Sequence, residues 1–227
     1  IEADSVNSAI LGPDATPGSP VFDLLVREVV REMTIKSGQK CTAIRRILAP
    51  RSVATELGAA IAAKLAGYTV GDPRNPAVRV GPLVSTAQRD AALAGLDRLY
   101  SECSVVYGGN RDFAPVDGGA STAFVQPTLL FCDRGLAAEQ VHDTEVFGPV
   151  ATIVPYADAA DAIAIARRGR GSLVASVFSD DAAFTARLTL GIADLHGRVL
   201  AVDSEVGSQH TGHGNVVPTC LHGGGGP

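Results

Sequence analysis

The sequence predicts an α/β fold: an open, mostly parallel, twisted sheet with helices on both faces. In the second half of the chain, short apolar segments alternate with segments of helical periodicity, which is the pattern of parallel β-α-β units. Hydrophobic residues make up 46% of the 227 residues and charged residues 19%, so the chain can bury a core of its own, as one large or two small domains. In such a sheet, the ligand crevice is expected at the carboxyl ends of the strands.

The chain opens with an apolar segment, and the first expected helix is long and amphipathic. The apolar segment spans residues 5–11, where Val6 and the run Ala9–Leu11 are apolar, and a loop rich in Pro and Gly follows it. Ser19 is suited to cap a helix and Pro20 to occupy its first turn, and apolar positions recur at helical spacing as far as Met33. We expect Gly38 to end this helix.

A short strand and an Ala-rich helix are expected next. The apolar run 44–48 is bounded by Pro50, which favours a buried strand, although residues 42–46 could instead begin with a helical turn. Residues 50–65 carry their larger apolar side chains on one face, which predicts a second helix.

A capping box opens the third expected helix. Ser85, with a glutamine three residues later, predicts a helix over 85–99. A strand is expected at 104–107, and the extended segment 124–130 contains Pro127, which indicates a sheet edge or an irregularity. The remaining elements alternate: strand 150–154, helix 157–167, strand 173–178, helix 180–190 and strand 198–202.

Charge and hydropathy exclude two classes of partner. The formal net charge is −5 and no stretch forms a basic stripe, so no nucleic-acid partner is expected. No apolar run approaches the roughly 20 residues that span a bilayer, and no leader precedes the first element, so we expect a cytoplasmic protein. The sequence starts at Ile1 and closes in a glycine run, which indicates a piece of a longer polypeptide.

The cysteines and histidines give no metal signature. The cysteines are irregularly spaced and are free thiols by default, and apart from the first they match no known chemistry. Most of the histidines fall in a late, Gly-rich part of the chain without acidic or thiol partners at ligand spacing, so no metal site is expected. The residues concerned are Cys41, Cys103, Cys132 and Cys220, and His196, His210, His213 and His222.

Cys41 is the candidate nucleophile. Gly38 lets the backbone turn closely before it, and residues 42–44 can form a tight turn whose N–H groups point back at the sulfur. Such amides stabilise a thiolate and an oxyanion. The local pattern is equally that of a small core residue, because free cysteines near strands usually pack as apolar side chains.

Two segments resemble the aldehyde dehydrogenase superfamily. Residues 38–43 (GQKCTA), followed by 45–48 (RRIL), are similar to its active-site cysteine segment. Residues 145–150 (EVFGPV) match its Glu-x-Phe-Gly-Pro segment in type and order, and the likeness runs from Glu2 to about Val202. The resemblance implies that residues 1–227 form the catalytic, cysteine-bearing domain. It also implies an upstream cofactor-binding domain and a C-terminal continuation that this chain lacks.

A narrower likeness points to one branch. Residues 1–5, together with 40–46, resemble the branch that oxidises CoA-linked semialdehydes in phenylacetate and benzoate breakdown. Most of the superfamily has a Glu-Leu-Gly-Gly-Lys run around its general base, whereas Glu2 here precedes Ala-Asp-Ser, as in that branch.

The resemblance implies a role for each site residue. Cys41 would attack the aldehyde to give a thiohemiacetal, hydride would leave to NAD or NADP, and Glu2 would activate water to hydrolyse the thioester. Glu145 would bind the nicotinamide ribose and Phe147 would position the ring. The alternatives are a solvated loop acid at Glu145 and an ordinary core aromatic at Phe147.

Three functions therefore stay open. The first is oxidation of an aldehyde, CoA-linked in the branch above, by a homo-oligomeric enzyme in which this piece alone is inactive. The second is a CoA-acylating aldehyde dehydrogenase, in which CoA takes the acyl group, and Glu2 argues against it. The third is a non-catalytic folding and oligomerisation module.

Overall fold

The computed structural model describes residues 4–118, 123–207, 209, 212–215 and 223. Within them, seven strands form one sheet in the order β3-β4-β5-β2-β1-β6-β7. All neighbouring strands are parallel except β3 and β4, so the expected open, mostly parallel α/β sheet is confirmed. The strands are β1 (Ser8–Leu11), β2 (Arg46–Pro50), β3 (Ser104–Tyr107), β4 (Thr128–Phe131), β5 (Val150–Tyr156), β6 (Ser172–Phe178) and β7 (His196–Val202).

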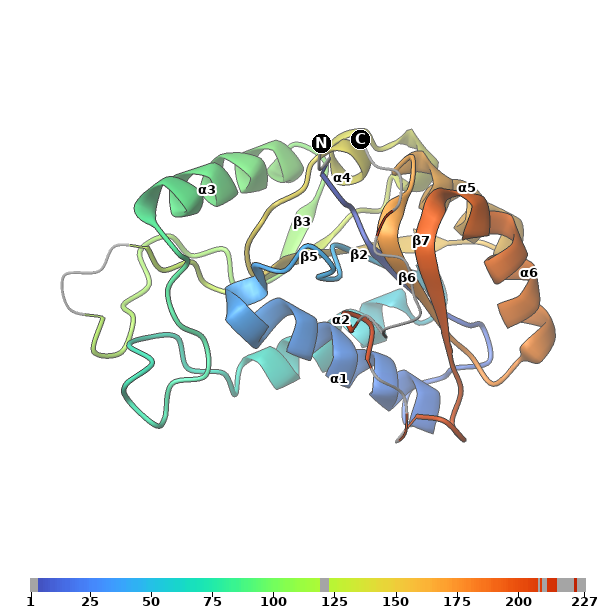
Figure 1. The fold of residues 1–227 in the computed structure, drawn as a ribbon, viewed down its shortest axis with the longest axis horizontal. Coiled ribbons are helices and arrows are strands. Elements are labelled where there is room, and N and C mark those ends of the chain that lie inside the picture. Colours follow the sequence, from blue (N-terminus) through green and yellow to red (C-terminus); the bar gives the residue numbers. More distant parts are fainter. Residues whose placement is uncertain (1–3, 119–122, 208, 210–211, 216–222, 224–227) are drawn as a thin grey trace.

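Helices cover both faces of this sheet, as expected (Figure 1). Helices α1 and α2 form one apolar core with one face of the sheet. Helices α3, α5 and α6 form a second apolar core with the opposite face. The helices are α1 (Pro20–Thr34), α2 (Ala54–Leu65), α3 (Thr86–Tyr100), α4 (Gln140–Asp143), α5 (Ala159–Arg168) and α6 (Ala182–Ile192), with short 3-10 segments η1 (Ile35–Gly38), η2 (Gly135–Ala137) and η3 (Ala193–Leu195).

Alternation along the central strands builds the two cores. In β1, Ala9 and Leu11 face the α1–α2 side while Ile10 faces the α5–α6 side. In β2, Leu48 likewise faces the side opposite to Ile47. Successive side chains of a strand point to opposite faces, so apolar runs buried on both sides are what a covered parallel sheet requires.

Side-chain caps fix the helix starts. Ser19 Oγ accepts from the Phe22 N–H at 3.3 Å, and Ser85 Oγ accepts from the Gln88 N–H at 3.2 Å. Both caps were predicted, and both satisfy donors that the first turn leaves open.

Several boundaries differ from the expectation, and those around the nucleophile segment have a physical reason. Helix α1 ends at Thr34 rather than at Gly38, because Lys36 and Ser37 already have positive φ. Strand β2 begins at Arg46 rather than at residue 44. Helix α2 begins at Ala54 rather than at residue 50, because Pro50 still belongs to β2.

Strand β4 lies inside the sheet, so the edge position inferred from Pro127 was wrong. The irregularity was correct: Pro127 immediately precedes β4, and the β3–β4 register shifts between Val105 and Tyr107. Among the described helices, none combines the length and apolar character that a membrane crossing requires.

Candidate functional site

One open cleft contains Cys41, Glu145 and Phe147. It has a volume of about 480 Å³. Three of the four predicted site residues therefore share one space, and the fourth, Glu2, lies outside the described residues. The lining residues are Asp4, Ser5, Gln39, Cys41, Val84, Gln88, Glu145, Phe147 and Leu173.

The cleft lies at the amino ends of the strands, so the predicted position at the carboxyl ends was wrong. Ser5 precedes β1, Cys41 precedes β2, Glu145 precedes β5 and Leu173 lies at the start of β6. The reason is that the nucleophile segment leads from a helix into a strand. Such a segment meets the sheet where the strand begins.

A left-handed turn presents Cys41. Lys36, Ser37 and Gly38 have backbone φ values of 51°, 54° and 71° in succession. Residues other than glycine adopt this left-handed conformation only at an energetic cost. Ser37 Oγ donates to the Gly81 carbonyl at 2.8 Å, which holds the turn. A Cβ at Gly38 would lie 2.2 Å from the Gly148 carbonyl oxygen, so only glycine fits.

Asn7 fixes the carbonyl of the nucleophile. Its Nδ2 donates to the Cys41 carbonyl at 2.8 Å and to the Ala43 carbonyl at 3.0 Å, and its Oδ1 accepts from the Val174 N–H at 3.1 Å. The Ala43 N–H donates to the Lys40 carbonyl at 3.0 Å. This amide is therefore committed within the turn, and the expectation that residues 42–44 direct their N–H groups at the sulfur was wrong for Ala43.

Arg45 joins the two signature segments. Its Nη2 donates to the Gly38 carbonyl at 3.0 Å and its Nη1 to the Gly148 carbonyl at 2.8 Å. Its Nε lies 3.4 Å from Glu145 Oε1, and the guanidinium carbon lies 5.5 Å from the centre of the Phe147 ring. Burial lowers the pKa of Arg45, and the Glu145 carboxylate opposes that effect. One side chain thus sets the spacing between the Cys41 turn and the Glu145 segment.

Glu145 and Phe147 occupy opposite environments. The Glu145 side chain is 9% exposed, and its Oε2 accepts from the Ser5 N–H at 2.9 Å. Burial raises the pKa of this carboxyl group, with Arg45 acting against it. The Phe147 residue is 37% exposed and lines the cleft. Glu145 is therefore not a solvated loop acid, and Phe147 is not an ordinary core aromatic.

A buried polar layer supports the turn from the α1 side. Glu32, which is 1% exposed, accepts from Lys40 Nζ at 2.7 Å, and burial raises the pKa of Glu32. Thr42 Oγ1 donates to the Gly214 carbonyl at 3.2 Å, and the neighbouring His213 N–H donates to Glu28 at 2.7 Å. The nucleophile segment is thereby tied to α1 and to residues 212–215.

His213 is a structural residue in this layer. It is fully buried, its Nδ1 lies 2.6 Å from Ser176 Oγ, and burial lowers its pKa to about 3. Within the described part of the chain, no group of three or more His, Cys, Asp or Glu side chains is placed to hold a metal ion. His210 and His222 lie outside it.

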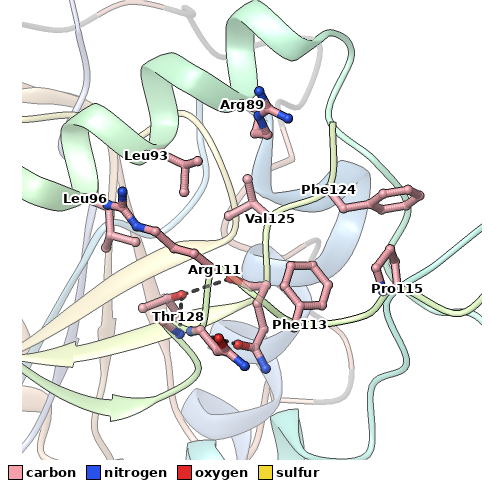
Figure 2. A pocket seen from close by; sticks show the side chains of 12 residues that line it. Arg89, Leu93, Leu96, Arg111, Phe113, Pro115, Phe124, Val125 and Thr128 are labelled. Atoms are coloured by element: carbon pink, nitrogen blue, oxygen red, sulfur yellow. Dashed lines mark hydrogen bonds between the residues drawn. The ribbon is translucent and has the colours of Figure 1, made fainter. Parts of the chain in front are cut away.

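A second cavity, of about 240 Å³, lies between α3 and the segment that connects β3 to β4 (Figure 2). Leu93 and Leu96 point into it from α3. At its rim, Arg89 pairs with an adjacent aspartate on α3, and Arg111 pairs with Asp97. The cavity contains none of the predicted site residues, and its cations already have acidic partners.

Sequence reasoning missed the two residues that position the nucleophile. In the sequence, Arg45 stands out only as part of the family-like segment 45–48, and its positioning role emerges from its contacts with the Gly38 and Gly148 carbonyls. Asn7 was not noted at all. Its signal is an amide side chain within the segment 5–11 that leads into a buried strand, and Asn7 is fully buried in the structure.

Comparison with known proteins gives a consistent family. A model of the aldehyde dehydrogenase family matches residues 3–211. The chain is 70% identical over 225 residues to the 3,4-dehydroadipyl-CoA semialdehyde dehydrogenase of Aromatoleum evansii, which covers 99% of this chain and 44% of that protein.

Solved structures agree. Betaine aldehyde dehydrogenase from Staphylococcus aureus, in complex with NAD+, matches with a TM-score of 0.76 at 26% identity, over 89% of this chain and 38% of the other. NADP-dependent glyceraldehyde-3-phosphate dehydrogenase from Bacillus halodurans C-125, complexed with NADP, matches with a TM-score of 0.72 at 26% identity, over 88% and 38%. The chain spans less than half the length of each of these proteins.

Proposed function

Because the chain belongs to the aldehyde dehydrogenase family, we propose that it supplies the nucleophile of an NAD- or NADP-dependent oxidation of an aldehyde to a carboxylic acid. The observation that carries this proposal is the shared cleft of Cys41, Glu145 and Phe147, which Arg45 holds together from behind. Cys41 lies in the first of the two segments that resemble the family, and Glu145 and Phe147 lie in the second.

The proposed chemistry begins at the sulfur. The Cys41 thiolate adds to the carbonyl carbon of the aldehyde and forms a thiohemiacetal. The C–H bond of that carbon then breaks, its electron pair leaves as hydride, and a thioester to Cys41 remains. Water adds to the thioester, the C–S bond breaks, and the acid and the free thiol are released. Glu2, the base that removes the proton from this water, is proposed from the family likeness.

The cleft fits a nicotinamide cofactor at one end. The exposed ring of Phe147 offers a flat apolar surface, and the buried carboxylate of Glu145 lies beside it. We assign Glu145 to the ribose hydroxyls and Phe147 to the nicotinamide ring. When bound, the cofactor accepts the hydride. Arg45 contacts both residues and keeps them at a fixed distance from the Cys41 turn.

The proposed substrate is an aldehyde linked to CoA and derived from aromatic-acid breakdown. Its support is the 70% identity, across almost the entire chain, to a protein named for a CoA semialdehyde. The chain covers 44% of that relative, so we propose activity for a polypeptide that also carries a cofactor-binding domain, and no turnover for these residues alone.

The test uses such a polypeptide and follows the first turnover. Cys41→Ala is expected to abolish formation of reduced cofactor, because no thiohemiacetal can form. Glu2→Gln is expected to keep a burst of about one equivalent per site and to stall afterwards, because the thioester is not hydrolysed. Cys103→Ala, which removes a thiol far along the chain from the cleft, should leave turnover unchanged.

Other outcomes point to the remaining functions. Normal turnover by Glu2→Gln would contradict the assignment of the base. Product that forms only with added CoA, and as acyl-CoA, would favour the acylating reaction. A Cys41 that resists alkylation within a stable oligomer would favour a module without chemistry.

A further inference from the structure

Two thiols outside the cleft face each other across the β3–β4 pair. Ser104 of β3 is opposite Phe131 of β4 in this antiparallel pair. The next position outward along both strands places Cys103 opposite Cys132, and the two thiols lie close enough to shift each other's pKa. Directly opposed residues of an antiparallel pair have Cα atoms about 4.5–5.5 Å apart, which lies inside the range of about 4.4–6.8 Å that a disulfide needs.

The backbone on both sides of this thiol pair is held in place. The Cys132 N–H donates to the Ile153 carbonyl at 2.8 Å, which continues the β4–β5 pairing. The Cys103 N–H donates to the Leu99 carbonyl at 3.0 Å, at the end of α3. These two hydrogen bonds hold the backbones of both cysteines beside the end of the β3–β4 pair.

The two sulfurs differ in access and in charge. Cys132 is fully buried in the core beneath α3, whereas Cys103 is half-buried, so solvent reaches the pair from the Cys103 side. The neighbouring Cys103 thiol and a backbone hydrogen bond from Arg134 lower the pKa of Cys132 to about 7 against the effect of burial, while Cys132 and burial raise the pKa of Cys103. A thiolate is the reactive form of cysteine, so the pair combines a reactive sulfur with a resolving thiol next to it.

We propose that Cys103 and Cys132 are a reversible redox modification site, which a small peroxide oxidises to a disulfide. One thiolate attacks an oxygen of hydrogen peroxide, the O–O bond breaks, and a sulfenic acid and hydroxide result. The second sulfur attacks the sulfenic sulfur, the S–O bond breaks, and the S–S bond forms. In sum, two thiols lose two protons and two electrons, and one peroxide takes them up and becomes two molecules of water.

The bond would fasten the edge of the sheet. Strand β3 is an edge strand, and the chain between the two cysteines contains the segment that lines the cavity of Figure 2. Closing this loop restricts the unfolded chain and secures β3 to β4. Cys41 is not involved, so the proposal stands independently of the dehydrogenase chemistry.

The test is differential alkylation of the full chain. The reduced protein is treated with hydrogen peroxide, blocked with iodoacetamide, digested and analysed by mass spectrometry. We expect a linked peptide pair that contains Cys103 and Cys132 and is lighter by two hydrogen atoms than the sum of its thiol forms. Dithiothreitol should restore both thiols to alkylation. Cys41→Ser should give the same linked pair.

Cys103→Ser is the informative variant, because a half-buried position tolerates serine while the buried Cys132 is left without its resolving thiol. Its circular dichroism should be unchanged and its linked pair absent. Full alkylation of both cysteines after peroxide in the parent chain would overturn the proposal. So would oxidation of Cys103 to sulfinic acid without linkage, or a dominant bond from either cysteine to Cys41.

Discussion

At the scale of single residues, Arg45 and Arg46 show how neighbouring arginines acquire different tasks. Arg45 serves the cleft, through carbonyls of the Cys41 turn and of the Glu145 segment. Arg46, on the opposite face of the strand, donates to the Val6 carbonyl at 3.1 Å and to the Ile165 and Ala166 carbonyls at 3.0 Å. At the start of β2, Arg45 therefore holds the segments of the cleft together, and the adjacent Arg46 binds the carbonyl groups of α5 on the other face of the sheet.

Replacing Arg45 with Met should be strongly destabilising. The variant keeps a long stem but leaves the buried Glu145 carboxylate without its cation, which in other proteins costs about 3–5 kcal/mol. We expect a loss of that size in the free energy of unfolding, measured with urea, and a matching loss of cofactor-dependent activity because the two site segments separate.

The matched control is Arg51→Met, which removes an exposed ion pair with Asp133. Exposed pairs contribute about 0–1 kcal/mol, so this variant should unfold close to the parent chain. Equal losses at both positions would mean that Arg45 does not join the segments in solution.

At the scale of elements, the 3-10 segment η1 decides where the nucleophile is placed. Three consecutive residues with positive φ turn the chain out of α1 and toward the start of β2. The turn is held by Ser37 on one side and passes against the Gly148 carbonyl on the other. Strain of this kind persists only where the surroundings impose it, and it commonly collects at functional sites.

Gly38→Ala tests the turn against a control glycine. Both Gly38 and Gly18 have positive φ, at 71° and 86°, so alanine costs about 1–2 kcal/mol of backbone energy at either position. At Gly18 nothing lies within 4 Å of the added Cβ, whereas at Gly38 the Gly148 oxygen would lie at 2.2 Å. We expect Gly38→Ala to lose about 1–3 kcal/mol more in urea unfolding, as overpacked sites do, and to change the alkylation rate of Cys41. Indistinguishable variants would argue against this close approach.

At the scale of the molecule, buried neutral histidines join distant parts of the fold. His142 is fully buried between Arg46 Nη1 and the Gly135 carbonyl, each 3.0 Å from a ring nitrogen. Since the guanidinium can only donate, Nδ1 accepts and Nε2 carries the proton. Burial first, and then Arg46, lowers the pKa of His142 to about 4, and burial lowers that of His213 to about 3.

These two histidines predict a loss of stability in mild acid. In the unfolded chain each titrates near its ordinary pKa of about 6.5, while in the folded chain it stays neutral, so unfolding takes up protons and is favoured as pH falls. The stability is fully present above pH 6.5 and is lost as pH falls toward the folded values. By pH 5.5 each histidine should cost about 1.4 kcal/mol relative to pH 7.5, or about 3 kcal/mol together.

Urea unfolding at pH 7.5, 6.5 and 5.5 measures this loss. The raised pKa values of Glu32 and Glu145 have the opposite effect on stability, because these groups favour the folded chain as pH falls. They titrate nearer the usual pKa of carboxyl groups, so the pH series stops at 5.5. The pKa of the buried His196 is also lowered by burial, so a His213→Gln variant should show a pH dependence smaller than the parent's by about 1.4 kcal/mol between pH 7.5 and 5.5. Stability that is constant or rises toward pH 5.5 would contradict the neutral state of the buried rings.

The sequence by itself determined the fold class, the capped starts of α1 and α3, and the family. Ser19 and Ser85 act on amide groups two or three residues away, and apolar alternation depends on neighbours along one strand, so these signals can be read locally. The two signature segments, around Cys41 and Glu145, were also evident without coordinates.

Only the tertiary structure decided where these residues meet. The contacts from Asn7 to Cys41, from Arg45 to Glu145 and from Cys103 to Cys132 follow from the strand order, which brings β1, β2 and β5 side by side and pairs β3 with β4. Because β1, β2 and β5 are parallel, their amino ends lie at one edge of the sheet, and the cleft residues that precede these strands gather there. Pairing between strands depends on packing across the whole sheet, so the residues of a single segment do not predict which strands become its neighbours.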